Sequence, residues 1–252
     1  MMCFTNQGIK MKKFILTIFL FTLFSISSKA QFEKDTIKTS KGNLIITFYG
    51  HASLMFQFNN YVIYADPVSR YADFTTQPKA DIILITHDHG DHFEPKVIEE
   101  LTRKGTSLIY TKLCSEKLEG GTILNNGDSK TVYGIKIEAV PAYNIVHMRE
   151  NGRPFHKKGD GNGYVVTFGN KRVYIAGDTE NIPEMKNLKN IDIAFLPMNL
   201  PYTMTPEMVA DAVRMFNPKI LYPYHYGDTD VNKLIELLKN KKDLEIRIRK
   251  MN

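Results

Sequence analysis

Four candidate metal ligands, His87, His89, Asp91 and His92, fall within seven consecutive residues of this 252-residue chain. The run is Thr86-His87-Asp88-His89-Gly90-Asp91-His92. In extended backbone, residues two apart point to the same side, so His87 and His89 can hold one cation between two imidazoles. The glycine that follows allows a sharp turn, after which Asp91 and His92 can reach a second cation nearby. A polar loop of solvated histidines is the alternative, but the density of donors favours a metal site.

The segments on either side of this run predict the elements that position it. Residues 82–86 form a continuous apolar, β-branched run, which is typical of a strand covered on both faces. Residues 94–104 have helical spacing. The metal-binding run is therefore expected between the end of a buried strand and the start of a helix.

The rest of the chain divides into two blocks that each begin with strands and then add helices. Further strands are predicted over residues 44–48, 53–58, 61–65, 107–110, 130–140, 163–168, 172–176, 191–197, 220–224 and 244–249, and helices over 205–216 and 231–240. This order favours an α/β fold in which two sheets form a sandwich with helices outside, giving αββα layers. The polar segment Asn144 to Asn162 shows no periodicity, and such long loops are often functional, so we expect it to border the site.

The motif His87 to His92, placed after a buried strand, resembles the HxHxDH signature of the metallo-β-lactamase superfamily, and the resemblance extends from about Asn43 to the C-terminus. It implies the four-layer αββα fold and a hydrolase with two metal ions. It also implies two further ligands at later strand ends, Asp178 and His225, with Asp178 as a catalytic carboxylate that bridges both metals. A bridging carboxylate suits this position because its two oxygens can hold two cations. A surface turn aspartate and a core histidine are the alternatives.

The remaining ligand of the first metal is the weak point of the resemblance. The family usually has a histidine soon after the strand that ends near residue 141, where this chain has Asn144. Two histidines follow, His147 and His156. The wider pattern is similar to a branch of exported and archaeal metal-dependent hydrolases related to the ascorbate-phosphate lactonase group, and in that branch His156 matches while His147 does not. We therefore expect His156 as the ligand, with Asn144 or water as the alternative.

Two neighbouring residues are expected to support the ligands. Asp66, before Pro67 at the end of a predicted strand, matches the family's first motif, an acid that orients a metal-site group. A turn aspartate is the alternative. His51 also fits the branch, either as a polar residue near the site or as a buried structural histidine.

The donor set also bears on the metal and the reaction. Imidazole and carboxylate ligands favour Zn²⁺, and ligand type leaves Mn²⁺ or Fe open. No cysteine occupies a ligand position, which disfavours antibiotic hydrolysis. Tyr143, Tyr202 or Tyr226 is expected to stabilise an oxyanion unless it serves only in packing.

The N-terminus is typical of a secretory signal peptide. Met11-Lys12-Lys13 precedes the apolar run Phe14 to Phe24, and Ser28-Lys29-Ala30 forms a cleavage site. The run of about eleven residues is shorter than the roughly twenty that a membrane-spanning helix needs. We expect cleavage after Ala30, leaving residues 31–252 as one exported domain, periplasmic or extracellular, with no membrane attachment.

Removal of this segment changes the charge and cysteine content. Four lysines and no acid are lost, so the formal charge falls from +6 to +2, which disfavours a nucleic-acid partner. Cys114 is left alone, and an unpaired thiol suits an exported protein only when it is buried. The oligomeric state is not determined by the sequence.

Hydrolysis of a small molecule by metal-activated hydroxide is the function that these features favour, with Asp91 as both ligand and proton shuttle. By resemblance, a lactone or another ester comes first as substrate and a phosphodiester second. The departure at Asn144 motivates an alternative, an exported non-catalytic metal-binding or sensing protein. The oxygen-reducing di-iron branch is disfavoured because it normally carries Glu where this chain has His89.

Overall fold

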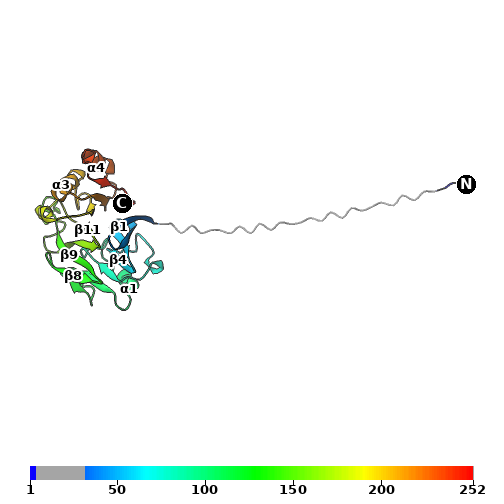
Figure 1. Ribbon diagram of the computed structural model, residues 1–252, viewed down its shortest axis with the longest axis horizontal. Helices are drawn as coiled ribbons and strands as arrows, with labels where there is room; N and C mark the ends of the chain where they lie inside the picture. The colour runs from blue at the N-terminus through cyan, green and yellow to red at the C-terminus, as the bar shows by residue number, and fades with distance from the viewer. Residues whose placement is uncertain (4–31, 252) are drawn as a thin grey trace. The chain divides into compact units, whose positions relative to one another are not determined.

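Two mixed sheets of seven strands form the centre of the fold (Figure 1). The computed structural model describes residues 1–3 and 32–251, so the predicted signal peptide lies almost entirely outside the described residues. The first sheet contains β1 (Glu33–Thr39), β2 (Gly42–Gly50), β3 (Ser53–Phe58), β4 (Tyr61–Ala65), β5 (Ile82–Leu84), β6 (Ser107–Tyr110) and β7 (Thr122–Ile123) in that spatial order. The second contains β8 (Ser129–Val132), β9 (Ile135–Ala142), β10 (Gly161–Phe168), β11 (Lys171–Ile175), β12 (Ile193–Pro197), β13 (Ile220–Tyr224) and β14 (Glu245–Ile246).

Both sheets are built on the same plan. Strands β1 to β4 pair antiparallel and β4 to β7 pair parallel, and β8 to β11 and β11 to β14 repeat this order. The helices are α1 (Pro95–Leu101), α2 (Lys112–Ser115), α3 (Pro206–Phe216) and α4 (Val231–Leu238), with 3₁₀ turns η1 (Phe74–Thr76) and η2 (Pro183–Asn187). Because neighbouring parallel strands end at the same edge of a sheet, the residues that follow them are brought together.

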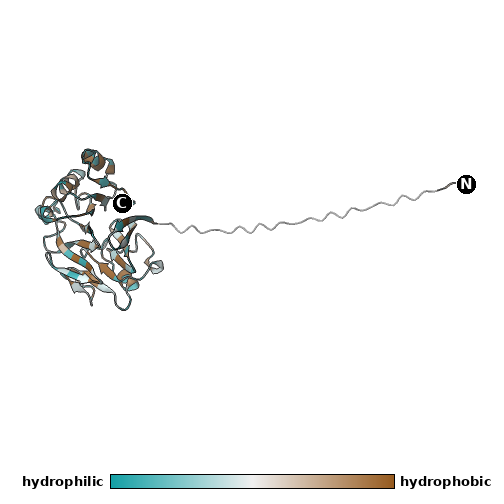
Figure 2. Ribbon diagram, in the orientation of Figure 1, coloured by the Kyte–Doolittle hydropathy of each residue, from teal (hydrophilic) through white to brown (hydrophobic). Residues whose placement is uncertain are grey.

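Packing on both faces of the sheets produces four layers. In β5, Ile82 and Leu84 point into the core between the sheets, while Ile83 packs in the cluster that α1 covers. A third apolar cluster lies between the second sheet and α3 and α4. Figure 2 shows apolar residues, in brown, on strands of the folded unit. The predicted αββα sandwich is confirmed.

One difference from the predicted elements lies in residues 130–140. They are not one strand but a hairpin of β8 and β9, joined at Tyr133 and Gly134, whose φ angles are 53° and 76°. Positive φ at both central residues is the geometry of the tight turns that join antiparallel strands. The predicted helix over 94–104 is also shorter, since α1 ends at Leu101 and Thr102 is extended.

Two smaller findings concern the thiol and the membrane. Cys114 is fully buried in the cluster beneath α1, so it meets the condition expected for an unpaired cysteine. Within the described residues, no helix is long and apolar enough to cross a bilayer.

Candidate metal centre

Most candidate ligands follow the ends of strands, and His156 lies in the long loop between β9 and β10. The run from His87 to His92 follows β5, Asp178 follows β11 and His225 follows β13. Three residues at this edge, His51, Asp66 and His225, have φ angles of 53°, 46° and 47°. Residues other than glycine rarely adopt this left-handed conformation, and it persists at functional sites where surrounding contacts enforce it.

His87, His89 and His156 form the first cluster of donors. One donor atom of each lies within 4.8 Å of the others, and His156 Nε2 is 3.2 Å from His89 Nδ1. Burial lowers the pKa of His87 well below its usual value, and burial lowers that of His156 to about 4 despite the opposing effect of Asp178. Both rings are therefore neutral near pH 7, the form that binds a cation. Catalytic zinc sites commonly have three protein ligands, such as three imidazoles, and leave one coordination position of the metal open.

The second cluster contains His51, Asp91, His92 and His225. Asp91 Oδ2 lies 3.2 Å from His51 Nε2 and 3.6 Å from His225 Nε2, and the His51 and His225 rings are 3.6 Å apart. Of the two environments left open for His51, the structure places it beside the candidate ligands. Burial alone would raise the pKa of Asp91, but the imidazoles of His225 and His51 hold it far below its usual value.

Asp178 lies between the two clusters. Its Oδ2 is 3.3 Å from His156 Nε2 and 3.4 Å from His225 Nε2, and its Oδ1 is 3.3 Å from His92 Nε2. Burial opposes ionisation of Asp178, but the neighbouring His225 and His92 hold its pKa well below the usual value. Burial lowers the pKa of His225, but the carboxylates of Asp178 and Asp91 outweigh burial and raise this pKa to about 9. One buried carboxylate thus faces donors of both clusters, as a bridging ligand would.

Unsatisfied polar atoms show that these residues fit metal ions. Seven buried side-chain nitrogen and oxygen atoms of the described residues make no hydrogen bond of acceptable geometry, and five of them belong to this centre. These five are His87 Nε2, His92 Nε2, His225 Nδ1, His225 Nε2 and Asp178 Oδ1. Burying a polar atom without a partner is costly, so such a concentration calls for a ligand. Nitrogen and carboxylate lone pairs directed at one another are suited to cations.

Asp66 orients one of these imidazoles. It is fully buried and accepts hydrogen bonds from Thr86 N at 2.8 Å and Thr86 Oγ1 at 2.6 Å. His92 Nδ1 donates to Asp66 Oδ2 at 2.8 Å, which leaves His92 Nε2 free to face Asp178. A carboxylate behind an imidazole fixes its tautomer and ring angle, the task expected of Asp66.

The structure distinguishes the three residues left open for the first cluster. His156 points into it, whereas His147 Nδ1 donates to Glu180 Oε1 at 2.7 Å. Asn144 Oδ1 accepts hydrogen bonds from His156 N at 2.9 Å and His156 Nδ1 at 2.8 Å. Asn144 therefore lies behind His156 rather than among the donors.

Glu180 is a buried residue of the site that the sequence reasoning missed. Its carboxylate accepts hydrogen bonds from Asn144 Nδ2 and from the backbone amides of residues 145, 146 and 147, at 2.7 to 3.0 Å. Burial raises its pKa, but these donors outweigh burial and lower it. Its only signal in the sequence is its position two residues after Asp178. Glu180 fixes the loop that carries Asn144.

A cavity of about 370 Å³ opens onto both clusters. Besides the candidate ligands it is lined by Arg149 and Phe155 from the long loop, and by Asn199 and Tyr202. Of the three tyrosines proposed as oxyanion donors, only Tyr202 lines it; the hydroxyls of Tyr143 and Tyr226 donate to Glu184 and to the Arg249 carbonyl. The sequence reasoning did not identify Arg149, Phe155 or Asn199.

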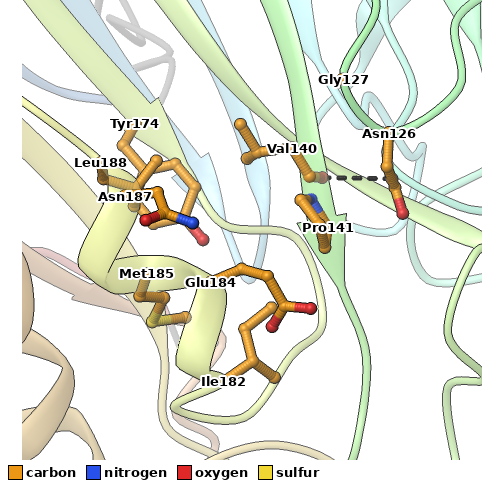
Figure 3. Close-up of a pocket in the computed structure, with 10 residues that line it drawn as sticks. All are labelled: Asn126, Gly127, Val140, Pro141, Tyr174, Ile182, Glu184, Met185, Asn187 and Leu188. Atoms are coloured by element: carbon orange, nitrogen blue, oxygen red, sulfur yellow. Dashed lines mark hydrogen bonds between the residues drawn. The ribbon is translucent and has the colours of Figure 1, made fainter.

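A separate cavity of about 300 Å³ lies between β9, β11 and η2 (Figure 3). Its walls are mostly apolar and include Val140, Pro141 and Met185. It contains none of the candidate metal ligands. The cavity that matters for metal chemistry is therefore the one at the strand ends.

Comparisons with known proteins show relatives among metal-dependent hydrolases. A family model described as the beta-lactamase superfamily domain matches residues 45–225. A crystal structure from Parabacteroides distasonis, described as a metal-dependent hydrolase, is 53% identical, covers 88% of this chain and 100% of its own, and has a TM-score of 0.84. A UPF0173 metal-dependent hydrolase of Methanopyrus kandleri is 30% identical over 72% of this chain and 84% of its own length. A metallo hydrolase of Ignicoccus hospitalis, 22% identical, shares the fold with a TM-score of 0.67 over 83% of this chain and 96% of its own.

Proposed function

Since this chain belongs to the metallo-β-lactamase superfamily, we propose that it is a metal-dependent hydrolase that uses two divalent cations, most simply Zn²⁺, to cleave a small ester. The observation that carries the proposal is the set of five unsatisfied donor atoms at the centre. His87, His89 and His156 would hold one cation, and Asp91, His92 and His225 the other, with Asp178 between them. A lactone comes first as substrate and a phosphodiester second.

The side chains divide the chemical work. When bound, the cations supply hydroxide near neutral pH and polarise the carbonyl or phosphoryl oxygen. Asp91 is the acid most accessible from the cavity, with 38% of its side chain exposed. It accepts the proton of the attacking water and returns it to the leaving group, while His51 Nε2, 3.2 Å from Oδ2, holds the carboxylate in place. Tyr202 lines the same cavity, from which its hydroxyl can donate to the developing oxyanion.

The position of His156 removes the reason for the non-catalytic alternative. That alternative arose because Asn144 stands where the family usually has a histidine, but His156 lies in the cluster instead and Asn144 contacts it from behind. The ligand set that hydrolysis needs is therefore complete.

Metal content and turnover test the proposal together. Purified protein should contain two metal ions per chain by mass spectrometry of the metals, and should hydrolyse at least one member of a panel of lactones, esters and phosphodiesters. His89→Ala should lose metal and turnover. The matched pair His156→Ala and His147→Ala separates ligand from neighbour, because only the first should lower the metal content. A His89→Ala variant that is metal-free and fully active would exclude the proposal.

We also propose that the protein acts outside the cytoplasm after cleavage following Ala30. The lysines at 12 and 13 and the apolar run after them support this. N-terminal sequencing of protein from fractionated cells should give Gln31 as the first residue; an intact N-terminus in the cytoplasmic fraction would contradict it.

A further inference from the structure

Two loops at the mouth of the metal cavity carry most of the exposed apolar side chains of the folded unit. Between residues 32 and 251, nine large apolar side chains are exposed, and five of them lie on these loops. These five, here called the apolar rim, are Ile145, Val146, Met148, Leu200 and Tyr202. Val146 is the most exposed of the nine, at 64%. Scattered exposed apolar residues are ordinary, but these five lie on the two loops that also line the metal cavity, one through Arg149 and Phe155 and the other through Asn199 and Tyr202. A concentration of apolar side chains on such loops marks a binding surface.

The rim is held in place by hydrogen bonds. Asn144 Nδ2 donates to the carbonyl of Tyr202 at 2.9 Å, which joins the two loops. The amides of Ile145 and Val146 each donate to the buried Glu180 carboxylate at 2.7 Å. The Tyr202 ring meets the Phe155 ring edge-on, with centroids 5.1 Å apart. Hydrogen bonds therefore hold the backbone that carries the rim, and this keeps its apolar side chains at the surface.

Arg149 adds a positive charge to this surface. It is the one lysine or arginine among the residues that line the metal cavity. Its guanidinium lies 5.0 Å from the centroid of the Phe155 ring, and its Nη2 donates to the Phe155 carbonyl at 3.3 Å. In the described part of the chain these contacts involve no carboxylate, and Arg149 is exposed, so the other N–H donors of its guanidinium are available to a ligand. A guanidinium fork matches the paired oxygens of an anion.

From this juxtaposition we propose that the substrate is an amphiphilic anion. Its apolar chain lies on the rim, and an anionic oxygen group at some distance from the cleaved bond binds Arg149. The inference rests on the proposed hydrolysis at the metal centre and names the class of ester that the centre cleaves. The rim accounts for the apolar part of the substrate, and Arg149 accounts for the charge.

Three 4-nitrophenyl esters with the same leaving group test the class on zinc-loaded protein. They are the acetate, the octanoate and the half ester of suberate, which has the length of octanoate but ends in a carboxylate. We expect kcat/KM to rise at least about tenfold from acetate to octanoate, since each methylene that is buried contributes roughly 0.8 kcal/mol. A further rise of about tenfold is expected from octanoate to suberate, because charge-assisted hydrogen bonds are about twice as strong as neutral ones.

Variants assign each preference to its residues. Arg149→Gln should reduce the ratio of suberate to octanoate turnover about tenfold, mainly through KM, and Arg149→Lys should retain part of it. Arg153→Gln, on the same loop but outside the cavity, is the matched control and should leave the ratio unchanged. Val146→Ser should reduce the ratio of octanoate to acetate turnover about threefold. Ile235→Ser removes a similarly apolar exposed side chain from α4 and should leave the ratio of octanoate to acetate turnover unchanged.

The outcomes separate this inference from the proposed function. Hydrolysis of all three esters at equal kcat/KM, or ratios that the Arg149 and Val146 variants leave unchanged, would overturn the amphiphilic class while hydrolysis stands. Failure of zinc-loaded protein to hydrolyse these esters and every lactone and phosphodiester of the panel would instead count against the function. Light scattering and sedimentation with phosphatidylglycerol vesicles complete the test. If Val146→Ser dissociates a dimer or abolishes vesicle binding without changing the ester ratios, the rim serves a second copy or a lipid surface, and the inference is wrong.

Discussion

Asn144 has a different task from the histidine that the family usually places at this position. Its Oδ1 accepts both the backbone amide and the Nδ1 proton of His156, twelve residues further along the chain. Because Nδ1 is the donor, Nε2 of His156 keeps its lone pair for a metal ion. Asn144 is in turn held by Glu180 and by the carbonyl of Tyr202. Asn144 therefore fixes the orientation of the His156 ring instead of joining the donors of the first cluster.

Loss of this contact should weaken metal binding without unfolding the protein. Asn144→Ala frees the His156 ring to rotate, and residues that orient a ligand typically change metal affinity by about 10- to 100-fold. Competition with a chromogenic chelator measures this change. Asn187→Ala, an exposed asparagine on η2, is the control. Equal affinities in the two variants would show that Asn144 does not position the ligand.

At the scale of elements, the chain just after β11 closely approaches the start of β10 and the residues that follow β5. Gly177 has a φ of 65°, and a Cβ there would lie 2.8 Å from the Asn162 carbonyl oxygen and 3.0 Å from Thr86 Cβ. Asp178 follows immediately. The Asp178 carboxylate, the proposed bridging ligand, is therefore held in place by a close backbone contact that only glycine permits.

Gly177→Ala should consequently cost stability and metal together. Gly120→Ala is the matched control, since Gly120 has a φ of 80° but nothing within 4 Å of an added Cβ. The control should lose about 1 kcal/mol from the left-handed conformation alone. Gly177→Ala should lose more and should bind less than two metal ions per chain. Urea denaturation and metal analysis measure both quantities, and equal losses in the two variants would contradict the role given to the contact.

A feature of the fold or the site could be predicted when it depends on residues close together in the sequence, and was missed when it depends on contacts with distant residues. The strand before His87 could be predicted because an apolar β-branched run needs cover on both faces, and β5 has it. The first strand, Glu33–Thr39, was missed because only Ile37 is buried in it, so its structure comes from pairing with β2. Glu180 was missed for a similar reason, since its partners are backbone amides more than thirty positions away.

At the scale of the whole domain, Asp35 connects the beginning of the chain with its end. It lies on β1 in the first sheet and binds Arg249 at 2.6 Å, Arg247 at 3.1 Å and the hydroxyl of Tyr222 on β13 in the second. Burial raises the pKa of Asp35, but the hydroxyl and the two guanidinium groups outweigh it and lower the pKa. This cluster therefore joins the two sheets through a charged carboxylate.

The stability that this carboxylate contributes should depend on pH. Because its pKa is lower in the folded state, the contribution is present above the unfolded value near 3.8 and is lost as the pH falls through the folded value. Asp35→Asn should lower the free energy of unfolding by about 2 kcal/mol at pH 7. The difference from wild type should shrink below pH 3.8. Urea denaturation at both pH values tests this; a difference that does not change with pH would refute it.

The division of the ligands between the two sheets has a consequence for how the metal enters. His51 and the run from His87 to His92 follow strands of the first sheet, while His156, Asp178 and His225 follow strands of the second. Neither sheet alone supplies all of the candidate ligands, so the proposed two-metal site is complete only after the two sheets have joined. On this proposal the bound ions would have to leave before the sheets separate, and removal of the metal should therefore speed unfolding.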